Sequence, residues 1–526
     1  MRISVYDTTL RDGSQAEGIT LTLADKVKLA VALDHFGVDY IEGGWPASNP
    51  KDIAFFERAR ELNLQHARIA AFGSTRRARV RPEEDANLIR LVETRASVIA
   101  IFGKSWDLHV LEALRVTHEQ NLEMIADSVR HLKRQAHVQE VIYDAEHFFD
   151  GYRSDAAYAL ATLKAAEEAG ADCVVLCDTN GGALPHQVAE AVQAARDHVR
   201  VPLGIHAHND SEMAVANTIA AVGQGAVHVQ GTINGYGERC GNANLCSILP
   251  ILELKLGIET VGRERLRRLT ELSAYVDEVT NQAHNARLPF VGRSAFAHKG
   301  GVHADAMLKH NGTYEHVPPE AVGNERRILI SELAGGSSVR QKAADFGIDL
   351  TKDSPVTRQV LQQIVQLENE GYSFEGAEGS FELLVRKALG QYEKAFDLVG
   401  FRVIVEKRAG DVEPITEATL KLRVGGRLAH TVAEGDGPVH ALDSAMRQAL
   451  IRFFPHLRDI KLTDFKVRVV NVKEGTAAKV RVAVETSDAQ ETWNTIGVSP
   501  NIIEASWQAL CDAVDYAMMK ERRARV

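Results

Sequence analysis

The first 260 residues alternate between short apolar runs and longer segments whose apolar positions recur at helical spacing. The short runs have the length and boundaries of buried strands. They are residues 3–10, 38–45, 68–74, 97–103, 140–148, 172–180, 202–209 and 228–235. Eight strand–helix units in about 250 residues are typical of a (β/α)8 TIM barrel. A doubly wound open sheet is the alternative, because strand number alone does not prove closure.

The segment after the first strand shows how the helices are delimited. Thr22 and Asp25 have the spacing of a capping box, which satisfies free backbone N–H groups at a helix start. Val27, Ala30 and the positions that follow keep a helical period, and Gly37 is a typical helix end. This segment therefore predicts an amphipathic helix that packs on the sheet.

The pattern changes after residue 260. Residues 261–285 have the pattern of a charged helix, and residues 286–330 are rich in loop-forming residues. Helical patterns return at 338–347, 354–370 and 380–394. We therefore predict a catalytic barrel over 1–260 and a linker with a helical subdomain over 261–395.

Residues 396–526 have a third pattern, in which apolar and polar residues alternate as in half-buried strands. The clearest stretches are 401–407, 418–424, 465–472 and 478–485, and helical patterns follow at 438–454 and 501–518. This order predicts an α+β domain built from an internal ββα repeat. Such a unit can pair across a dimer or hold a small ligand between its loops, and an accessory domain without a ligand fits equally well.

Composition narrows the class of protein. The formal net charge of the 526 residues is −10, which argues against a nucleic-acid or anionic-membrane partner. The five cysteines form no C-x-x-C pair, so neither a disulfide framework nor an oxidising compartment is indicated. No apolar run approaches the ~18 residues of a membrane span, and the N-terminal stretch lacks the apolar core of a secretory signal. We expect a cytoplasmic protein.

Polar residues gather where the predicted barrel strands end. In a closed barrel, active residues come from the C-terminal ends of several strands. The residues at these ends are Arg11, Asp12, Gln15, Glu146, Asp178, Thr179, His206, His208, Asp210, Asn234, Glu238, Arg239 and Asn242.

His206 and His208 are two residues apart on one predicted strand, so both side chains point to the same face. Asp12 ends the first strand, and Asn242 follows the eighth. Two imidazoles, a carboxylate and an amide oxygen suit one divalent metal ion such as Zn, Mn, Co or Mg. The alternative is a polar strand end without a metal.

Other residues fit a catalytic role and a purely structural role equally. The guanidinium of Arg11 suits a carboxylate or a developing enolate oxygen, although an ion pair with Asp12 is the simpler interpretation. Glu146 is equally compatible with a solvated charge at a strand end. In the loop-rich segment, one group could form a small acid–base cluster, namely His303, Asp305 and Tyr314.

Together these stretches resemble one enzyme family. DTTLRDGSQ (7–15), GIHAHND (204–210), GTINGYGERCGNANL (231–245), AHKGGVHAD (297–305) and WNTIGVSPNIIEASWQAL (493–510) are similar to motifs of the α-isopropylmalate, homocitrate and citramalate synthase family. The resemblance covers nearly the whole chain, in the family's order. EGGWPASNPKD (42–52) and DAEHFFDGY (144–152) are most similar to the citramalate synthase branch. Many isopropylmalate synthases have an acidic residue where Ser14 stands.

The resemblance implies a role for each candidate residue. It implies metal ligation by Asp12, His206, His208 and Asn242, and catalytic roles for Arg11, Glu146 and His303. It also implies substrate contacts from Arg11, Gln15, Thr179, Asp305 and Tyr314. The linker residues would reach the barrel mouth of a partner subunit, and the identity of the general base stays open.

The family relation also implies substrates and regulation. The citramalate branch condenses acetyl-CoA with pyruvate, and its C-terminal domain dimerises and binds an amino-acid effector, expected here to be isoleucine in a homodimer. A first alternative is 2-isopropylmalate synthase, which uses 2-oxoisovalerate and responds to leucine. A non-catalytic amino-acid sensor and a metal-dependent aldolase are alternatives of other classes.

Overall fold

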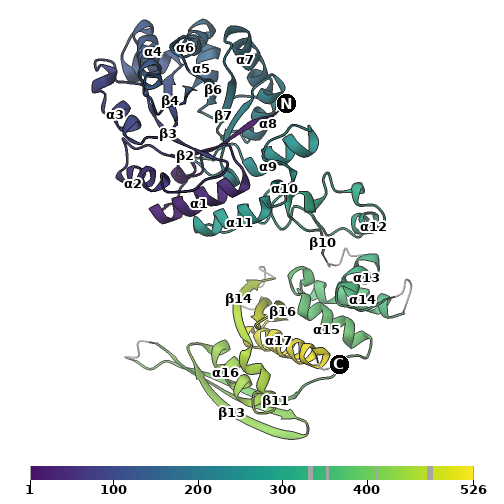
Figure 1. Ribbon diagram of the computed structural model, residues 1–526. Helices are drawn as coiled ribbons and strands as arrows, with labels where there is room; N and C mark the ends of the chain where they lie inside the picture. The colour runs from purple at the N-terminus through teal and green to yellow at the C-terminus, as the bar shows by residue number, and fades with distance from the viewer. Residues whose placement is uncertain (1, 330–335, 351–354, 410–412, 471–477, 525–526) are drawn as a thin grey trace. The chain divides into compact units, whose positions relative to one another are not determined.

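The computed structural model describes residues 2–329, 336–350, 355–409, 413–470 and 478–524 (Figure 1). The chain forms two compact units. The first comprises Met1–Phe296 and Val317–Arg326, and the second comprises Ala297–His316 and Arg327–Val526.

The first unit is built on a closed barrel of parallel strands, in which β1 pairs with both β2 and β8. This closure confirms the TIM barrel and excludes the doubly wound open sheet. The strands are β1 (Ser4–Asp7), β2 (Tyr40–Gly44), β3 (Arg68–Ser74), β4 (Val98–Lys104), β5 (Glu140–Glu146), β6 (Cys173–Asp178), β7 (Leu203–Ala207) and β8 (His228–Gly231).

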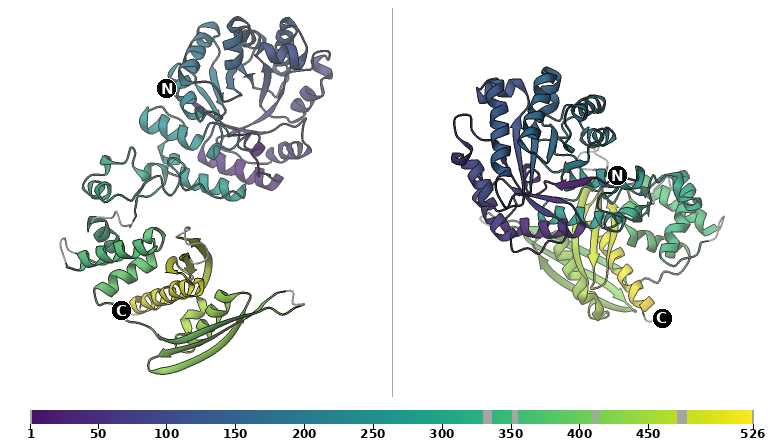
Figure 2. Two further views of the ribbon diagram at one scale, coloured as in Figure 1. Left: turned by 180° about the vertical axis from the view of Figure 1, so that it is seen from behind. Right: turned by 45° about the horizontal axis from the view of Figure 1, so that its top comes forward.

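Helices surround this ring of strands (Figure 2). They are α1 (Leu23–Phe36), α2 (Pro50–Ala59), α3 (Ala86–Glu93), α4 (His118–Lys133), α5 (Phe148–Ser154), α6 (Ala156–Ala169), α7 (Pro185–His198), α8 (Ala214–Gly223), α9 (Leu245–Pro250), α10 (Arg263–Leu266) and α11 (Leu269–Val279). Short 3-10 helices complete the unit, namely η1 (Gly13–Gln15), η2 (Pro82–Glu84), η4 (Ile233–Gly235) and η7 (Pro319–Val322), together with two short π-helical segments, η3 (His109–Leu114) and η5 (Ile251–Lys255).

Helix α1 follows the prediction in detail. The backbone N–H of Asp25 donates to the Thr22 hydroxyl, and the Asp25 carboxylate accepts from the Thr22 N–H, which completes the capping box. The helix ends at Gly37, whose φ of 93° lies in the left-handed region that glycine adopts without strain. Helix α11 packs against α1, so the contacts of the barrel unit extend beyond residue 260. The predicted domain boundaries at 260 and 395 stay predictions.

The barrel interior is filled by side chains from alternate strand positions, as in other TIM barrels. Aromatic and small residues form this inner cluster, and it includes Tyr6, Tyr40, Phe72, Val98 and Cys177. A larger apolar core lies between the strands and the surrounding helices. The barrel is therefore a packed support, and the space for ligands lies at its end.

The second unit begins with helices. They are α12 (Gly301–Lys309), α13 (Gly336–Asp345), α14 (Pro355–Glu370) and α15 (Glu378–Ala388), with short strands β9 (Ala297–His298) and β10 (Arg327–Ile328) and turns η6 (Asn311–Thr313) and η8 (Phe374–Gly376). The three helical patterns after residue 330 are confirmed. Residue 354, where the second of them begins, lies outside the described residues.

The C-terminal region confirms the internal repeat and corrects its composition, because each copy contains three antiparallel strands and one helix. The first copy is β11 (Asp397–Glu406), β12 (Ile415–Val424), β13 (Arg427–Gly435) and α16 (Pro438–Leu450), followed by η9 (Pro455–Asp459). The second is β14 (Lys461–Val469), β15 (Val480–Ser487), β16 (Thr492–Ser499) and α17 (Ile502–Ala524). Residues 471 and 472 of a predicted strand lie outside the described residues.

The missed strands are β13 and β16, which immediately follow another strand after a tight connection. Gly425 and Gly426 connect β12 to β13 with positive φ angles of 53° and 80°. Such a two-glycine connection is the signature of a tight hairpin. The glycine pair therefore carries the local signal for β13, although the predicted strands did not include it.

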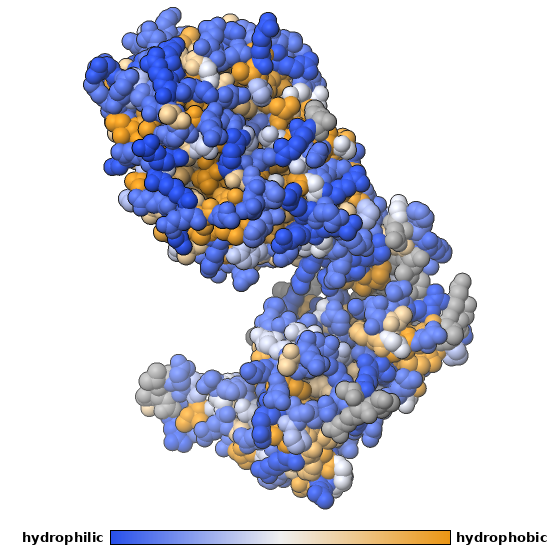
Figure 3. All heavy atoms as spheres, viewed as in Figure 1, coloured by the Kyte–Doolittle hydropathy of each residue, from blue (hydrophilic) through white to orange (hydrophobic). Residues whose placement is uncertain are grey.

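Several apolar side chains of this C-terminal region are exposed, among them Val399, Val405, Ile415, Leu428 and Val432. Figure 3 shows apolar residues that reach the mostly hydrophilic surface. Within the described part of the chain, no helix combines the length and the apolar character that crossing a membrane requires.

Candidate metal centre and active site

A cavity of about 200 Å³ lies at the C-terminal end of the barrel. The strand ends that the sequence singled out converge on it. Its lining residues are Arg11, Asp12, Gln15, Trp45, Phe72, Phe102, Asp144, Glu146, Cys177, Thr179, His206, His208, Glu238 and Arg239.

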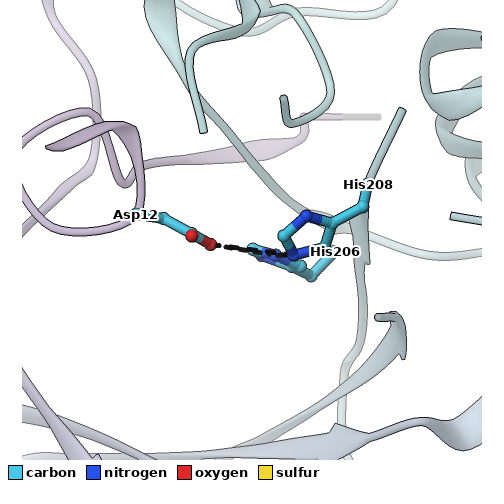
Figure 4. A group of neighbouring side chains, drawn as sticks. All are labelled: Asp12, His206 and His208. Carbon is cyan, nitrogen blue, oxygen red and sulfur yellow. Dashed lines mark hydrogen bonds and ion pairs between the residues drawn. The ribbon is translucent and has the colours of Figure 1, made fainter. Parts of the chain in front are cut away.

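Asp12, His206 and His208 form the only group of three metal-type side chains found among the residues that the structure describes. The Nε2 atoms of the two histidines lie 3.3 Å apart, and Asp12 Oδ2 lies 3.3 Å from that of His206 and 4.0 Å from that of His208. Figure 4 shows the carboxylate of Asp12 and both imidazoles directed at one point. All three residues are buried, which suits a site that holds a cation.

Two buried polar residues, Gln230 and Asp144, fix the imidazole of His206 through its Nδ1 atom. Its Nδ1 lies 2.9 Å from Gln230 Oε1, and Gln230 Nε2 donates to Asp144 Oδ1 at 3.2 Å. Because the amide oxygen of Gln230 only accepts, it selects the tautomer with a proton on Nδ1 of His206. The Nε2 lone pair is then directed at Asp12 and His208, as metal ligation requires.

The protonation of the triad fits cation binding. Burial raises the pKa of Asp12, but the charges of Arg11 and His206 outweigh it and hold the pKa far below its usual range. Burial lowers the pKa of His206, yet the bond to Asp12 raises it overall. Burial and the neighbouring His206 lower the pKa of His208 to about 4. A neutral His208 offers a lone pair, and a cation would replace the proton between His206 and Asp12.

Asn242 lies beside this triad because its backbone pairs with that of His208. It forms an isolated antiparallel bridge with His208, and its amide nitrogen donates to the carbonyl of Tyr236 at 3.3 Å. Asn242 Oδ1 is buried and has no hydrogen-bond partner in the described part of the chain. Buried acceptors without partners are rare, and this oxygen has the chemistry of a fourth metal ligand.

Arg11 is fixed by a carboxylate from the neighbouring strand. Its Nε donates to Glu42 Oε1 at 2.7 Å and its Nη2 donates to Oε2 at 3.3 Å, which is a two-point contact. The guanidinium carbon lies 3.8 Å from the ring centroid of Phe72. Arg11 Nη1 also lies 3.5 Å from Asp12 Oδ2. The guanidinium is therefore preorganised, and it places positive charge beside the triad.

Glu146 and Thr179 also line the cavity. Glu146 forms an ion pair with Lys104, the last residue of β4. The Thr179 hydroxyl accepts from the backbone N–H of His147 at 2.9 Å. Gln15, at the end of η1, is exposed at the cavity.

The three linker candidates belong to the second compact unit. The rings of His303 and Tyr314 are stacked, with centroids 4.2 Å apart, and both residues are exposed. Asp305 forms an ion pair with Lys309 at 2.6 Å. Two members of the predicted acid–base cluster therefore contact each other.

Sequence reasoning missed four residues that support this site, namely Glu42, Lys104, Asp144 and Gln230. Glu42, Asp144 and Gln230 lie within barrel strands, and Lys104 is the last residue of β4. A charged or amide side chain inside a buried strand was the signal, because such groups are rarely buried without a partner.

Comparison with known proteins agrees with the fold. Residues 2–275 match the HMGL-like family, residues 290–371 match the homocitrate synthase post-HMGL domain-like family, and residues 375–518 match the LeuA allosteric (dimerisation) domain. The (R)-citramalate synthase of Geobacter sulfurreducens is 55% identical over 98% of both chains.

The (R)-citramalate synthase of Aquifex aeolicus is 52% identical over 99% of this chain and 98% of its own. A probable 2-isopropylmalate synthase of Methanopyrus kandleri is 31% identical over 99% of both chains. The barrel and its polar mouth therefore define an HMGL-like enzyme with a LeuA-type C-terminal domain. Within this class, the chain belongs to the (R)-citramalate synthase family.

Proposed function

We propose that the protein condenses acetyl-CoA with pyruvate and hydrolyses the thioester to release (R)-citramalate and CoA. The observation that carries this proposal is the convergence of Asp12, His206, His208 and Arg11 on one barrel-end cavity. The high identity to (R)-citramalate synthases over the full chain supports the choice of reaction.

The metal site is proposed to comprise Asp12, His206, His208 and Asn242. A bound divalent cation would polarise the keto group of the 2-keto acid as a Lewis acid. The mixed nitrogen and oxygen ligands are compatible with Zn, Mn, Co or Mg. Gln230 would keep His206 in the tautomer that leaves Nε2 free.

The condensation forms one carbon–carbon bond. A base removes a proton from the methyl group of acetyl-CoA, and the resulting enolate carbon attacks the keto carbon of pyruvate. The keto oxygen gains the electron pair and then a proton, so it becomes a hydroxyl group. We propose that Arg11 stabilises negative charge on the reacting oxygens, because its rigid guanidinium already faces the triad.

The remaining candidates supply contacts and proton transfer. We propose that Thr179 donates to the carboxylate of the keto acid, and that Gln15 lines the substrate. Glu146 and His303 are the candidates for moving the proton, with Asp305 and Tyr314 beside His303. Water then attacks the thioester carbonyl, the carbon–sulfur bond breaks, and the sulfur of CoA leaves and takes a proton.

The wall of the cavity favours a small keto acid. The rings of Phe72 and Phe102 are stacked at 5.5 Å, and Trp45 meets Phe102 edge-on at 5.5 Å. Trp45 is itself held in place, because its Nε1 donates to Asn87 Oδ1 at 2.8 Å. This rigid aromatic wall leaves room for the methyl group of pyruvate and opposes the branched side chain of 2-oxoisovalerate.

We further propose that residues 396–526 dimerise the protein and bind isoleucine as an effector, while residues 1–260 catalyse and 261–395 link the two. The match to a LeuA allosteric (dimerisation) domain supports this arrangement. The exposed apolar residues of β11, β12 and β13 offer surface for a second copy. The protein would act in isoleucine biosynthesis in the cytoplasm.

An assay of CoA release tests the function. Acetyl-CoA would be combined with pyruvate, 2-oxobutanoate, 2-oxoisovalerate or 2-oxoglutarate, with and without divalent metal, and free thiol would be measured. We expect metal-dependent release with pyruvate far above the other acids. A higher kcat/KM for 2-oxoisovalerate would instead indicate an isopropylmalate synthase, and no release with any acid would indicate a sensor.

A further inference from the structure

The loop that follows β8 carries Asn242, the proposed fourth metal ligand, and this loop is anchored to helix α11. The anchor is the carboxylate of Asp277, which is only 3% exposed. Its Oδ1 accepts from Asn234 Nδ2 at 2.5 Å and from the hydroxyl of Tyr236. A helix that lies beyond the eighth strand in the chain therefore contacts the loop that bears a candidate ligand.

The carboxylate of Asp277 is fixed from a second side as well. Its Oδ2 lies 2.6 Å from Nδ1 of His284, which donates because a carboxylate only accepts. Burial and the bond to Asp277 raise the pKa of the Tyr236 hydroxyl, so this group keeps its proton and acts as the donor. Two oxygens with separate partners give the carboxylate one orientation.

Asn234 holds the start of the loop in a left-handed backbone conformation, with φ of 62° and ψ of 6°. Few residues other than glycine adopt this region, and asparagine is among them. Its Nδ2 also donates to the carbonyl of Ser273 on α11 at 2.9 Å. Its Oδ1 accepts from the Ser273 hydroxyl at 2.6 Å and from Cys246 Sγ at 3.4 Å. Contacts with α11 therefore maintain the turn that begins the loop.

Tyr236 connects this anchor to Asn242 through its backbone carbonyl. The carbonyl oxygen accepts from the Thr232 hydroxyl at 2.6 Å and from Asn242 Nδ2 at 3.3 Å. Because a carbonyl cannot donate, it selects the amide orientation in which the nitrogen of Asn242 faces Tyr236. Oδ1 is then the amide atom without a partner in the described part of the chain, and it is free to ligate a cation.

The loop packs tightly around this amide. The backbone N–H of Asn242 donates to the carbonyl of Gly235 at 3.0 Å. A Cβ atom on Gly237 would lie only 2.1 Å from Asn242 Nδ2, so the backbone approaches this closely because the residue is glycine. A displacement of Tyr236 would therefore also displace Asn242.

We propose that Asp277 is a positioning residue for the metal centre, and that it orients Asn242 Oδ1 through the hydroxyl and the carbonyl of Tyr236. The inference rests on the proposed metal site and adds to it a residue that lies outside the strand ends. A purely structural Asp277 would stabilise the fold without changing the affinity for a cation. Metal affinity therefore distinguishes the two roles.

Tyr236→Phe is the mildest test, because it removes the hydroxyl and keeps the ring and the carbonyl. Competition with a fluorescent chelator on the full chain would give the Kd of Zn or Mn. We expect this Kd to rise about tenfold or more in Y236F, as is typical when a partner that orients a ligand is lost. Tyr275→Phe on the same helix is the matched control and should bind as the wild type does. Wild-type affinity in Y236F would overturn the proposal.

Asp277→Asn tests the anchor itself. Its amide nitrogen would face a donor on one side, either Tyr236 or His284, so one of the two bonds is lost. We expect the Kd of the metal to rise about tenfold or more in D277N. The exposed neighbour Glu278→Gln, which removes the same charge from α11, should leave the Kd unchanged. Equal affinities in D277N and E278Q would contradict the positioning role.

A double-mutant cycle separates positioning from stability. Asn242→Ala removes the oxygen that is to be oriented, so Y236F should cause no further loss of metal affinity in the N242A background. Thermal unfolding of the same proteins without metal would report their stability separately. An equal loss from Y236F in both backgrounds would show that Tyr236 does not act through Asn242, and the proposal would fail.

These measurements need no substrate, so their failure is distinguishable from failure of the proposed condensation. Weaker metal binding in Y236F supports the positioning role whether or not CoA is released. The visible absorption of bound Co depends on its ligands and their geometry. It should change in Y236F in the same direction as in N242A, and stay unchanged in Y275F. A wild type that binds no divalent cation would overturn the inference.

Discussion

The imidazole of His206 is hydrogen-bonded to Gln230 across the interface of β7 and β8, with 2.9 Å between Nδ1 and Oε1. Neither residue is exposed to an appreciable degree. Gln230 is itself anchored to Asp144 of β5 across the barrel interior. His206 is thus oriented by Gln230 and Asp144, two side chains that are not members of the triad.

Replacing this anchor is expected to weaken metal binding. Gln230→Leu removes the acceptor that selects the His206 tautomer, and loss of such a partner typically lowers metal affinity about ten- to hundred-fold. Competition with a fluorescent chelator would measure the dissociation constant of Zn or Mn directly. Gln193→Leu on α7 serves as the control, and an unchanged affinity in Q230L would show that Gln230 does not position His206.

Arg11 is expected to resist conservative replacement. Lys cannot reproduce the two-point contact of Arg11 with Glu42, so the charge would no longer be held beside Asp12. We expect Arg11→Lys to lower kcat about a hundred-fold or more, with a much smaller change in the KM for acetyl-CoA. Steady-state kinetics with pyruvate would test this, and Arg153→Lys on α5 is the comparison. A near-normal kcat in R11K would show that Arg11 does not stabilise charge during the reaction.

The aromatic wall is expected to set keto-acid preference. Phe102→Ala removes one ring of the Trp45, Phe72 and Phe102 cluster and enlarges the cavity. The ratio of kcat/KM for 2-oxoisovalerate to that for pyruvate should rise about ten- to hundred-fold, the range that one hydrophobic pocket contact provides. Phe149→Ala, which lies outside this cavity, should leave the ratio unchanged. A constant ratio in F102A would mean that another surface selects the acid.

The buried His228 is expected to make barrel stability depend on pH. Its ring lies among Tyr6 and Tyr40, with centroids 5.3 and 5.5 Å away, and burial lowers its pKa to about 3. The unfolded chain, with a histidine pKa of about 6.5, binds a proton that the folded chain does not. Stability contributed by neutral His228 is therefore complete above about pH 6.5 and is lost as the pH falls toward 3.

Comparing unfolding free energies at pH 7.5 and pH 5 would check this. Between pH 7.5 and pH 5, the free energy of unfolding of the wild type should fall by about 2 kcal/mol more than that of His228→Phe. This value follows because uptake of one proton on unfolding changes the free energy by ~1.4 kcal/mol per pH unit. Exposed His186→Gln should retain the slope of the wild type. Parallel pH dependence in H228F and wild type would show that His228 does not cause the loss.

Much of this molecule was readable from its sequence because the relevant signals are local. Apolar periodicity located all eight barrel strands to within a few residues, and the Thr22–Asp25 spacing located the start of α1. The two-residue spacing of His206 and His208 placed both rings on one face of a strand. Chain order then placed Asp12 at the same barrel end, since parallel strands of a closed barrel all end together.

Only the tertiary structure decided which residues support these candidate metal ligands. Gln230 and Asp144 reach His206 from other strands, and Glu42 reaches Arg11 from 31 positions away in the chain. No local pattern encodes such pairings, because they depend on side-chain directions across a closed sheet. Asp277 likewise reaches Tyr236 from 41 positions along the chain, because α11 packs against the loop that follows β8. Sequence determined the framework and the candidate ligands, whereas packing determined the partners that orient them.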